Sequence, residues 1–393
     1  MTHLHQSPTD AAFVQNPYPF YDHARTVGPV VVWADYKMAA AFDAATVRAL
    51  LRDRRLGRER PAAIETEAAP HLASFQALEQ HSMLELEGPR HSRLRGLVLR
   101  AFTSRRIAAL APEIASLSHS LIDAFPNDAF DLLPTYCTQI PVRIIARLLG
   151  VPEDMAPQLL DWSHRMVAMY QAGRTRQIED EANAAARDFT AFLRTYVEQR
   201  RADPADDLIT HLIAAEEDGT RLSTDEMIST CILLLNAGHE ATVHGLGNGV
   251  KTLLETGTGP DWLTPDRIAG TVEEILRFDP PLHMFTRYAY DTMRVGEIEL
   301  QPGDEIAVML GAANRDPALW PEPNRFDPAR ESQTHTSLGG GAHFCVGAPL
   351  ARLEMQVALP ILFARCPNLR LSAPPRYANT YHFHGLTALT VTR

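Results

Sequence analysis

Apolar residues recur at helical spacing over most of this 393-residue chain. A repeat of i, i+3, i+4 and i+7 is typical of a helix with one buried face. We therefore predict helical segments in five stretches, namely 89–125, 139–201, 224–255, 266–278 and 350–363. Val30 to Trp33 are β-branched or aromatic and predict a short strand, and the alternating stretch 283–310 predicts a small β region. The expected fold class is mainly α with small β-sheets.

The helix predicted over 224–255 has the clearest start signal. Ser223 and Glu226 have the spacing of a capping box, in which each side chain bonds to the backbone of the other. The centre of this helix, from Cys231 to Ala237, is apolar nearly all round, which predicts that it is buried. Neither a linker nor an internal repeat interrupts the sequence, so we expect one domain over residues 1–393.

Composition narrows the class of protein. The net charge is −11 and the arginines form no long basic run, which argues against a nucleic-acid partner. The 4 cysteines lack paired spacing, so they predict a reducing compartment rather than a disulfide framework. Residues 1–10 are polar, and no run approaches the ~20 apolar residues of a membrane span. We expect a cytoplasmic monomer that does not bind membranes.

The stretch from Leu338 to Arg352 carries the most specific chemistry. Three consecutive glycines allow a tight loop, and Cys345 follows where this loop enters a predicted helix. Free backbone N–H groups and the positive end of that helix favour a thiolate. Gly347 leaves room for a large flat group. Such a cysteine suits the fifth ligand of a haem iron, although a lone cysteine is more often a small buried hydrophobic residue.

This stretch resembles the haem-ligand loop of the cytochrome P450 superfamily, Phe-Gly-x-Gly-x-His-x-Cys-x-Gly-x-x-Leu-Ala-Arg. Leu338 stands where the family usually has Phe, which affects packing near the thiolate. The resemblance covers most of the chain and is to the bacterial, soluble, ferredoxin-dependent type. It implies the cytochrome P450 fold, with a long central helix over haem b. It also implies a single haem-thiolate monooxygenase domain, with Cys345 as the iron ligand and Gly347 beside the cofactor.

Glu274 and Arg277 lie at i and i+3 on one face of the helix predicted over 266–278. Such pairs are common on solvated helices and indicate little alone. Together with Pro323 to Phe326 they resemble the family's Glu-x-x-Arg motif and the arginine that follows it. The resemblance implies a buried Glu274–Arg277–Arg325 network that fixes the core beside the haem, where breaking a pair strands a charge.

Polar residues interrupt the apolar centre of the long helix. Gly238 with polar neighbours predicts a local distortion that opens the backbone, where a carboxylate and a hydroxyl can relay protons. The stretch is similar to the family's oxygen-activation motif, which implies that Glu240 is the relay acid and that Ala237 and Gly238 lie beside the haem. Ala241 replaces the usual Thr, and Thr242 follows ~100° further round the helix. Whether Thr242, a water or a substrate hydroxyl donates to dioxygen is left open.

Four basic residues match positions that hold haem propionates in the family. His91 and Arg95 are four residues apart, so they share one helix face. Arg287 lies in the predicted β region, and His343 lies in the cysteine loop. A further group of arginines near His91 predicts a basic patch that would attract an acidic ferredoxin. Its members are Arg90, Arg93, Arg100, Arg105 and Arg106.

The resemblance implies a monooxygenase that inserts one oxygen atom from O2 into a C–H bond of an apolar small molecule. Electrons would come from an external [2Fe-2S]-type ferredoxin with its reductase. Substrate-contacting segments of the family map onto Leu234, Met284 and Phe285, without a cluster of basic residues. We therefore expect a neutral substrate of terpenoid or steroid size.

Two alternatives stay open at this point. The departure at Ala241 leaves room for a peroxide-driven peroxygenase or a haem dehydratase. A non-catalytic haem or gas-binding protein is the third possibility, and the acid at Glu240 argues against it.

Overall fold

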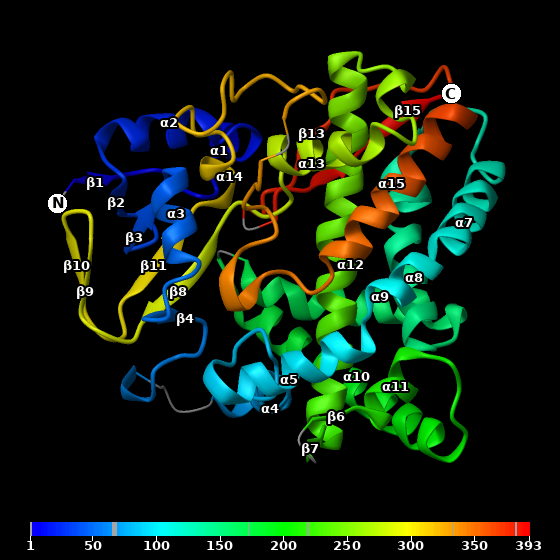
Figure 1. The fold of residues 1–393 in the computed structure, drawn as a ribbon, viewed down its shortest axis with the longest axis horizontal. Coiled ribbons are helices and arrows are strands. Elements are labelled where there is room, and N and C mark those ends of the chain that lie inside the picture. Colours follow the sequence, from blue (N-terminus) through cyan, green and yellow to red (C-terminus); the bar gives the residue numbers. More distant parts are fainter. Residues whose placement is uncertain (1, 65–68, 172, 218–219, 332, 382) are drawn as a thin grey trace. The chain divides into compact units, whose positions relative to one another are not determined.

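The computed structural model describes residues 2–64, 69–171, 173–217, 220–331, 333–381 and 383–393. The chain forms two compact units that are each assembled from separate stretches (Figure 1). Unit 1 comprises residues 1–64, 114–138 and 241–393. Unit 2 comprises residues 65–113 and 139–240. The single-domain organisation stays a prediction.

Unit 1 is built on a six-stranded mixed sheet. Its strands, in spatial order, are β1 (His3–Leu4), β2 (Val30–Trp33), β3 (Met38–Ala41), β11 (Glu305–Val308), β8 (Phe285–Ala289) and β4 (Leu56–Gly57). The pairs β1–β2 and β3–β11 are parallel, and the other pairs are antiparallel. Ala40 belongs to one hydrophobic core cluster and its neighbours Ala39 and Ala41 to another, so both faces of the sheet are covered. The strand predicted at Val30–Trp33 is confirmed.

Smaller sheets complete the β structure of unit 1. Strands β9 and β10 form a hairpin, β12, β15 and β5 form a three-stranded sheet, and β13 pairs with β14. The bounds are β5 (Phe130–Asp131), β9 (Met293–Val295), β10 (Ile298–Leu300), β12 (Arg370–Leu371), β13 (Arg376–Tyr377), β14 (Leu386–Ala388) and β15 (Thr390–Thr392). The small β region predicted over 283–310 is confirmed by β8 to β11.

Two helices of unit 1 carry the predicted motifs. The helix predicted over 266–278 is α13 (Ile268–Phe278), and the one predicted over 350–363 is α15 (Ala348–Arg365), which continues through Pro360. The remaining helices are α1 (Ala11–Gln15), α2 (Tyr18–Val27), α3 (Ala44–Leu50), most of α7 (Ala111–Asp123) and α14 (Leu310–Ala313). Short turns complete the set: η1 (Ala62–Ile64), the π-helical η3 (Leu133–Cys137), η6 (Pro260–Trp262) and η7 (Gly341–His343).

Unit 2 is helical apart from one short hairpin. Its helices are α4 (Ala73–Glu79), α5 (Gly88–Ala101), α6 (Ser104–Ala109), α8 (Gln139–Leu149), α9 (Ala156–Val167), α10 (Arg176–Ala202), α11 (Leu208–Ala214) and the part of α12 (Thr224–Thr256) up to residue 240. The turns η2 (Pro70–Leu72), η4 (Glu153–Met155) and η5 (Ala168–Tyr170) and the hairpin β6 (Glu216–Glu217) and β7 (Thr220–Arg221) complete it. The predicted helical stretches are divided by local stop signals, such as Gly150 at φ +83° and the capping side chain of Thr103.

The long helix α12 (Thr224–Thr256) begins as the sequence predicts. The amide of Ser223 donates to Glu226 Oε2 at 2.9 Å, and the amide of Glu226 donates to Ser223 Oγ at 3.2 Å, which confirms the capping box. The predicted opening of the backbone at Gly238 is not seen, because α12 is α-helical throughout its described length. A Cβ at Gly238 would lie 3.6 Å from Ile145, an ordinary packing distance, so this glycine does not disturb the helix.

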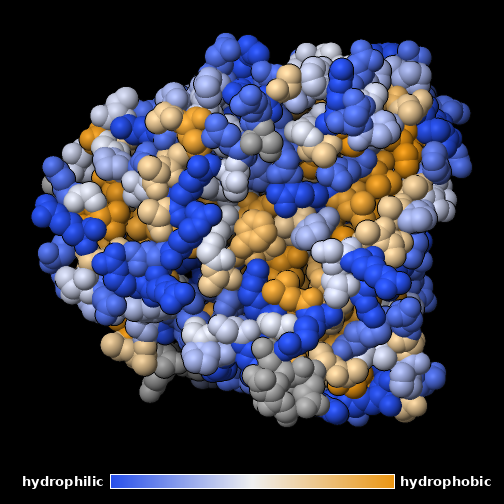
Figure 2. All heavy atoms as spheres, viewed as in Figure 1, coloured by the Kyte–Doolittle hydropathy of each residue, from blue (hydrophilic) through white to orange (hydrophobic). Residues whose placement is uncertain are grey.

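One face of the molecule is largely hydrophilic (Figure 2), and the cysteines form no disulfide among the described residues. Figure 2 shows hydrophilic residues over much of one face, with hydrophobic residues in patches between them. No described helix combines the length and the apolar character that a membrane crossing needs. Cys137, Cys231, Cys345 and Cys366 form no disulfide in the part of the chain that the structure describes.

Candidate functional site

The loop that carries Cys345 is held in a tight turn within unit 1. The amide of Cys345 donates to the carbonyl of Leu338 at 3.0 Å, which closes the loop. Gly341 has φ +67°, and a Cβ there would lie 2.3 Å from the carbonyl oxygen of Leu51. This position therefore requires glycine for both its backbone conformation and its close contact. The glycine-rich sequence thus fixes where the thiol lies.

Cys345 lies three residues before Ala348, the first residue of α15, as the predicted loop-to-helix junction requires. Gly347 is the residue that caps this helix, and a Cβ there would lie 3.8 Å from the Cys345 sulfur. The helix N-terminus favours the thiolate form through its dipole and its free N–H groups. Arg352 adds positive charge, and its pKa is raised mainly by Glu273, with a smaller contribution from Cys345. The sulfur is therefore in an electropositive setting.

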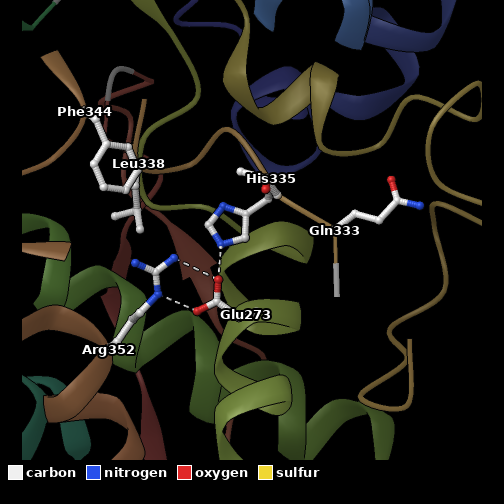
Figure 3. A pocket seen from close by; sticks show the side chains of 7 residues that line it. Glu273, Gln333, His335, Leu338, Phe344 and Arg352 are labelled. Carbon is white, nitrogen blue, oxygen red and sulfur yellow. Dashed lines mark hydrogen bonds and ion pairs between the residues drawn. The ribbon is translucent and has the colours of Figure 1, made fainter. Parts of the chain in front are cut away.

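Glu273 and Arg352 form an ion pair that links α13 to α15 (Figure 3). Nε and Nη2 of Arg352 donate to the two carboxylate oxygens at 2.5 and 2.8 Å, and His335 Nε2 lies 3.3 Å from Oε2. Burial raises the pKa of Glu273, but the bonds from Arg352 and His335 outweigh this effect and lower it to about 2. These residues, with Leu338 and Phe344, line a hollow of about 150 Å³. No sequence pattern indicates this pair, because Glu273 and Arg352 are far apart in the chain.

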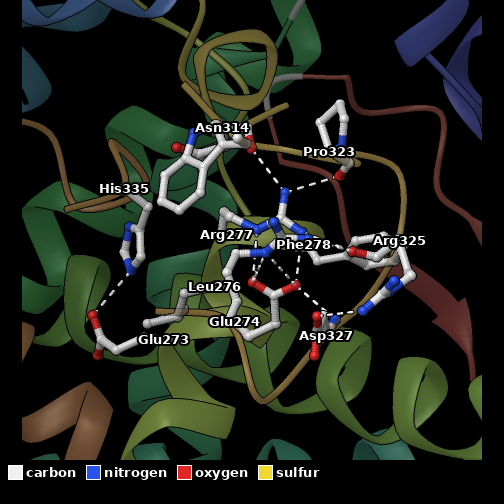
Figure 4. Close-up of polar contacts among 12 residues, drawn as sticks. Glu273, Glu274, Leu276, Arg277, Phe278, Asn314, Pro323, Arg325, Asp327 and His335 are labelled. Carbon is white, nitrogen blue, oxygen red and sulfur yellow. Dashed lines mark hydrogen bonds and ion pairs between the residues drawn. The ribbon is translucent and has the colours of Figure 1, made fainter. Parts of the chain in front are cut away.

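Glu274 and Arg277 form a second ion pair on α13 (Figure 4). Two hydrogen bonds of 2.7 Å join them, and Arg277 also donates to the carbonyls of Asn314 and Pro323 at 2.9 Å. This geometry saturates the guanidinium, which a buried cation requires. The pair therefore ties α13 to the loops after α14.

The third member of the predicted network, Arg325, takes part differently from the prediction. Its carbonyl accepts from Arg277 at 3.2 Å, whereas its guanidinium turns to Glu322 and Asp327 at 2.7 and 2.6 Å. The Arg325 side chain is 58% exposed. The second guanidinium near Glu274 belongs to Arg330, whose Nε lies 3.4 Å from Glu274 Oε2. A motif fixes which residue types occur, but the direction of an exposed side chain depends on neighbours that the motif does not include.

Arg287 and the residues before it lie in unit 1. Arg287 is buried on β8, and its guanidinium carbon lies 5.8 Å from the centre of the Phe285 ring. That ring lies against the cysteine loop, 3.2 Å from where a Cβ on Gly339 would be. Met284 belongs to a core cluster with Tyr21 and Trp33. Phe285 and Met284, both expected to contact substrate, therefore have packing contacts that account for their positions.

Two of the predicted propionate donors lie on α5 of unit 2. His91 is buried and Arg95 is half-buried. They are one helical turn apart, as the sequence predicts, and thus lie on the same side of α5. His343, the fourth predicted donor, lies in η7 of unit 1, two residues before Cys345.

The acid that the sequence singles out is surrounded by two histidines within unit 2. Glu240 is buried on α12, and its Oε1 lies 3.0 Å from His164 Nε2 and 3.4 Å from His239 Nε2. The hydrogen bond to Glu240 raises the pKa of His164, and burial opposes this effect. Periodicity could not associate His164 with Glu240, because His164 lies on the separate helix α9. Thr242 is also buried.

The arginines of the predicted basic patch are partly neutralised within unit 2. Arg93 pairs with Glu226, and Arg106 Nη2 lies 3.8 Å from Asp206. Arg90, Arg100 and Arg105 are exposed on α5 and α6. The net positive charge of this patch is therefore smaller than its five arginines alone would give.

The comparisons with known proteins agree with one another. The family model matches part of the chain, and individual relatives match nearly all of it. The family model described as Cytochrome P450 matches residues 268–375. Cytochrome P450 monooxygenase PikC of Streptomyces venezuelae is 33% identical over 382 residues, which cover 92% of this chain and 87% of that protein. Vitamin D(3) 25-hydroxylase of Pseudonocardia autotrophica is 37% identical over 370 residues, covering 92% of this chain and 89% of that protein.

A solved structure is similar over a slightly longer span than these two relatives. It is that of P450BioI in complex with an acyl carrier protein ligated to hexadec-9Z-enoic acid. It matches with a TM-score of 0.92 and 32% identity, covering 98% of this chain and 100% of that one.

Proposed function

This chain belongs to the cytochrome P450 family of haem-thiolate monooxygenases, and on that premise we propose that it oxidises a C–H bond of a neutral, apolar molecule of terpenoid or steroid size. The similarity to a vitamin D(3) 25-hydroxylase, at 37% identity, supports this size and polarity. The electropositive cysteine loop carries the assignment of the chemistry. Leu234, which is buried on α12, is the residue that we place against the substrate.

The residues of the cysteine loop fit haem b. When bound, this cofactor supplies the iron that activates O2 and performs the oxidation. A haem of this kind would take one soft ligand for its iron from the protein. Cys345 would be that single ligand. Among the described residues it is not part of either His/Cys/Asp/Glu group that could hold a metal ion by itself.

Further residues would hold the cofactor's carboxylates and approach its ring. In unit 1, the buried cation Arg287 and the loop residue His343 would each donate to a propionate. In unit 2, His91 and Arg95 would do the same, and Ala237 and Gly238 would lie beside the ring. Burial of Arg287 supports this role, since a buried guanidinium is stabilised by an anionic partner.

Glu240 is the residue that we propose to hold and transfer protons during turnover. Its carboxylate is buried, and His164 lies 3.0 Å from Oε1 with a side chain that is 54% exposed. This arrangement supports a path by which a proton enters from solvent. We propose that Thr242 assists through its hydroxyl, because Ala241 cannot donate.

The electron donor that we propose is a [2Fe-2S]-type ferredoxin with its reductase, acting on a cytoplasmic monomer. The exposed arginines Arg90, Arg100 and Arg105 support an acidic partner. A peroxide-driven reaction is the alternative that the missing Thr at position 241 favours. Comparing product formation with hydrogen peroxide and with a surrogate ferredoxin pair distinguishes the two.

A spin-state titration of the ferric holoenzyme tests the substrate class. Steroids, terpenoids, fatty acids and small aromatics are added in turn while the low-spin to high-spin change is recorded. We expect a saturable change with steroids or terpenoids. A change with fatty acids alone, or with an acyl carrier protein that bears a fatty acyl group, would overturn the neutral-substrate proposal and favour an acyl ligand such as the one in the P450BioI complex.

A further inference from the structure

We propose that His164, His239 and Glu240 form a site for a divalent transition metal ion, with Zn²⁺ as the best match. One carboxylate oxygen and one nitrogen from each imidazole lie within 4.8 Å of one another in unit 2. Two histidines and one glutamate are a donor set that zinc adopts in proteins. The site lies apart from Cys345 in the chain and is separate from the haem ligand.

Two of the three distances between donor atoms match the edges of a zinc tetrahedron, and the third is within 4.8 Å. Zinc lies about 2.0–2.1 Å from histidine nitrogens and carboxylate oxygens, so two tetrahedral ligands are about 3.3 Å apart. Glu240 Oε1 lies 3.0 Å from His164 Nε2 and 3.4 Å from His239 Nε2. An ion could therefore bind after small adjustments of side chains, without movement of the helices.

His239 has the tautomer and the direction of a metal ligand. Its Nδ1 donates to the carbonyl of Leu235 at 2.7 Å, so Nε2 carries a lone pair when the ring is neutral. A hydrogen bond donated by the second ring nitrogen to a backbone carbonyl is the usual way in which a ligating histidine is oriented. Nε2 forms no hydrogen bond within the described parts of the chain, although the residue is 2% exposed. A lone pair facing a carboxylate oxygen is stabilised by a cation placed between the two.

Access and charge distinguish this group from a second one. His164 is 54% exposed on α9, so an ion can reach the site from solvent. The other candidate group, Asp279, His283 and His384, is completely buried in unit 1. There Lys251 Nζ already lies 3.2 Å from Asp279 and supplies a positive charge. The accessible group is therefore the one that we assign.

Metal binding would also affect turnover, and this consequence rests on the proposed function of Glu240. Coordination occupies the carboxylate oxygen that would otherwise accept and release a proton. Zinc would therefore slow product formation while leaving haem binding unchanged.

Isothermal titration of the holoenzyme with ZnCl2 tests the site directly. We expect one tight site in the wild type, and an affinity about 100-fold weaker or worse in His164→Ala, since even outer-shell changes cost metal sites about 10–100-fold. His164→Lys keeps a cation beside Glu240 but cannot ligate, so it also loses the site. His211→Ala is the matched control in unit 2. His211 is not a member of the proposed site, and its Nε2 lies 2.9 Å from Asp206 Oδ1.

Identical isotherms for the wild type and His164→Ala would overturn the proposal. Zinc inhibition of product formation is then measured on the same proteins. Inhibition is expressed relative to the zinc-free rate of each protein. Inhibition of the wild type that is absent in His164→Ala supports both the metal site and the proton role of Glu240. Tight binding without inhibition keeps the metal site and overturns the proton role of Glu240.

Discussion

Arg277 donates two hydrogen bonds of 2.7 Å to the carboxylate of Glu274, and the side chains of Arg277 and Glu274 are 1% and 4% exposed. An ion pair so deeply buried contributes little over an apolar pair, but removing one partner leaves an uncompensated charge. Arg277→Met should therefore lower the free energy of unfolding by about 3–5 kcal/mol. Denaturant unfolding of the holoenzyme, with haem content measured in parallel, checks this value.

Arg325 provides the matched control for that prediction. Its guanidinium is 58% exposed and reaches Arg277 only through the backbone carbonyl. Arg325→Ala should therefore change the free energy of unfolding by less than about 1 kcal/mol. A loss as large as that of Arg277→Met would contradict the division of roles between backbone and side chain.

The ion pair of Glu273 predicts a pH dependence of stability. The pKa of Glu273 falls from 4.5 to about 2 on folding, so its carboxylate stabilises the folded protein above about pH 4.5. This contribution is lost as the pH falls from 4.5 towards 2. Glu273→Gln should be less stable than the wild type at pH 7, and the gap in denaturation midpoint should narrow below pH 4.5.

Glu299→Gln serves as the control for that measurement, because Glu299 is exposed on β10. Its stability should follow the wild type within about 0.5 kcal/mol at pH 7. A gap between Glu273→Gln and the wild type that widens in acid would have the wrong sign for a carboxylate with a lowered pKa.

Gly341 allows backbone strain to be separated from steric overlap. Gly341→Ala combines φ +67° with a Cβ only 2.3 Å from the Leu51 carbonyl, whereas Gly88→Ala has φ +60° and open space around it. We expect Gly88→Ala to cost about 1–2 kcal/mol from the backbone alone. Gly341→Ala should cost clearly more and reduce the haem content. Equal costs would mean that the contact with Leu51 does not shape the cysteine loop.

Glu240 should affect turnover without affecting haem ligation. A general acid contributes about 100-fold or more, so Glu240→Gln should slow product formation by at least that factor. Glu255→Gln, an exposed position on the same helix that pairs with Lys251 at 3.2 Å, should retain the wild-type rate. If Glu240→Gln keeps more than a third of the wild-type rate, the proton passes through another group.

Local signals explain which elements could be predicted from the sequence. The capping box at Ser223 and the glycines before Cys345 act over a few residues, so pattern and spacing locate them. The contacts of His164 with Glu240 and of Glu273 with Arg352 join separate helices. Periodicity carries no information on such pairs, because it describes one helix at a time.

Two further differences have the same physical origin. Arg325 matches its motif, yet its guanidinium follows the acidic neighbours Glu322 and Asp327 to the surface. Phe285, whose contact with substrate stays a prediction, has its ring beside Gly339 in the loop where Leu338 replaces the usual Phe, which the sequence did not indicate. Residue type was predictable in both cases, but the direction of the side chain depends on packing between distant segments.

The carbon monoxide complex of the reduced holoenzyme tests the central claim, that Cys345 supplies the thiolate ligand of the haem. Spectra are compared for the wild type, Cys345→Ser and the control Cys366→Ser, which changes a buried cysteine elsewhere in unit 1. We predict the red-shifted Soret band of thiolate ligation in the wild type and in Cys366→Ser, and its loss in Cys345→Ser. The same red-shifted band in Cys345→Ser would contradict the account, because another residue would then hold the iron.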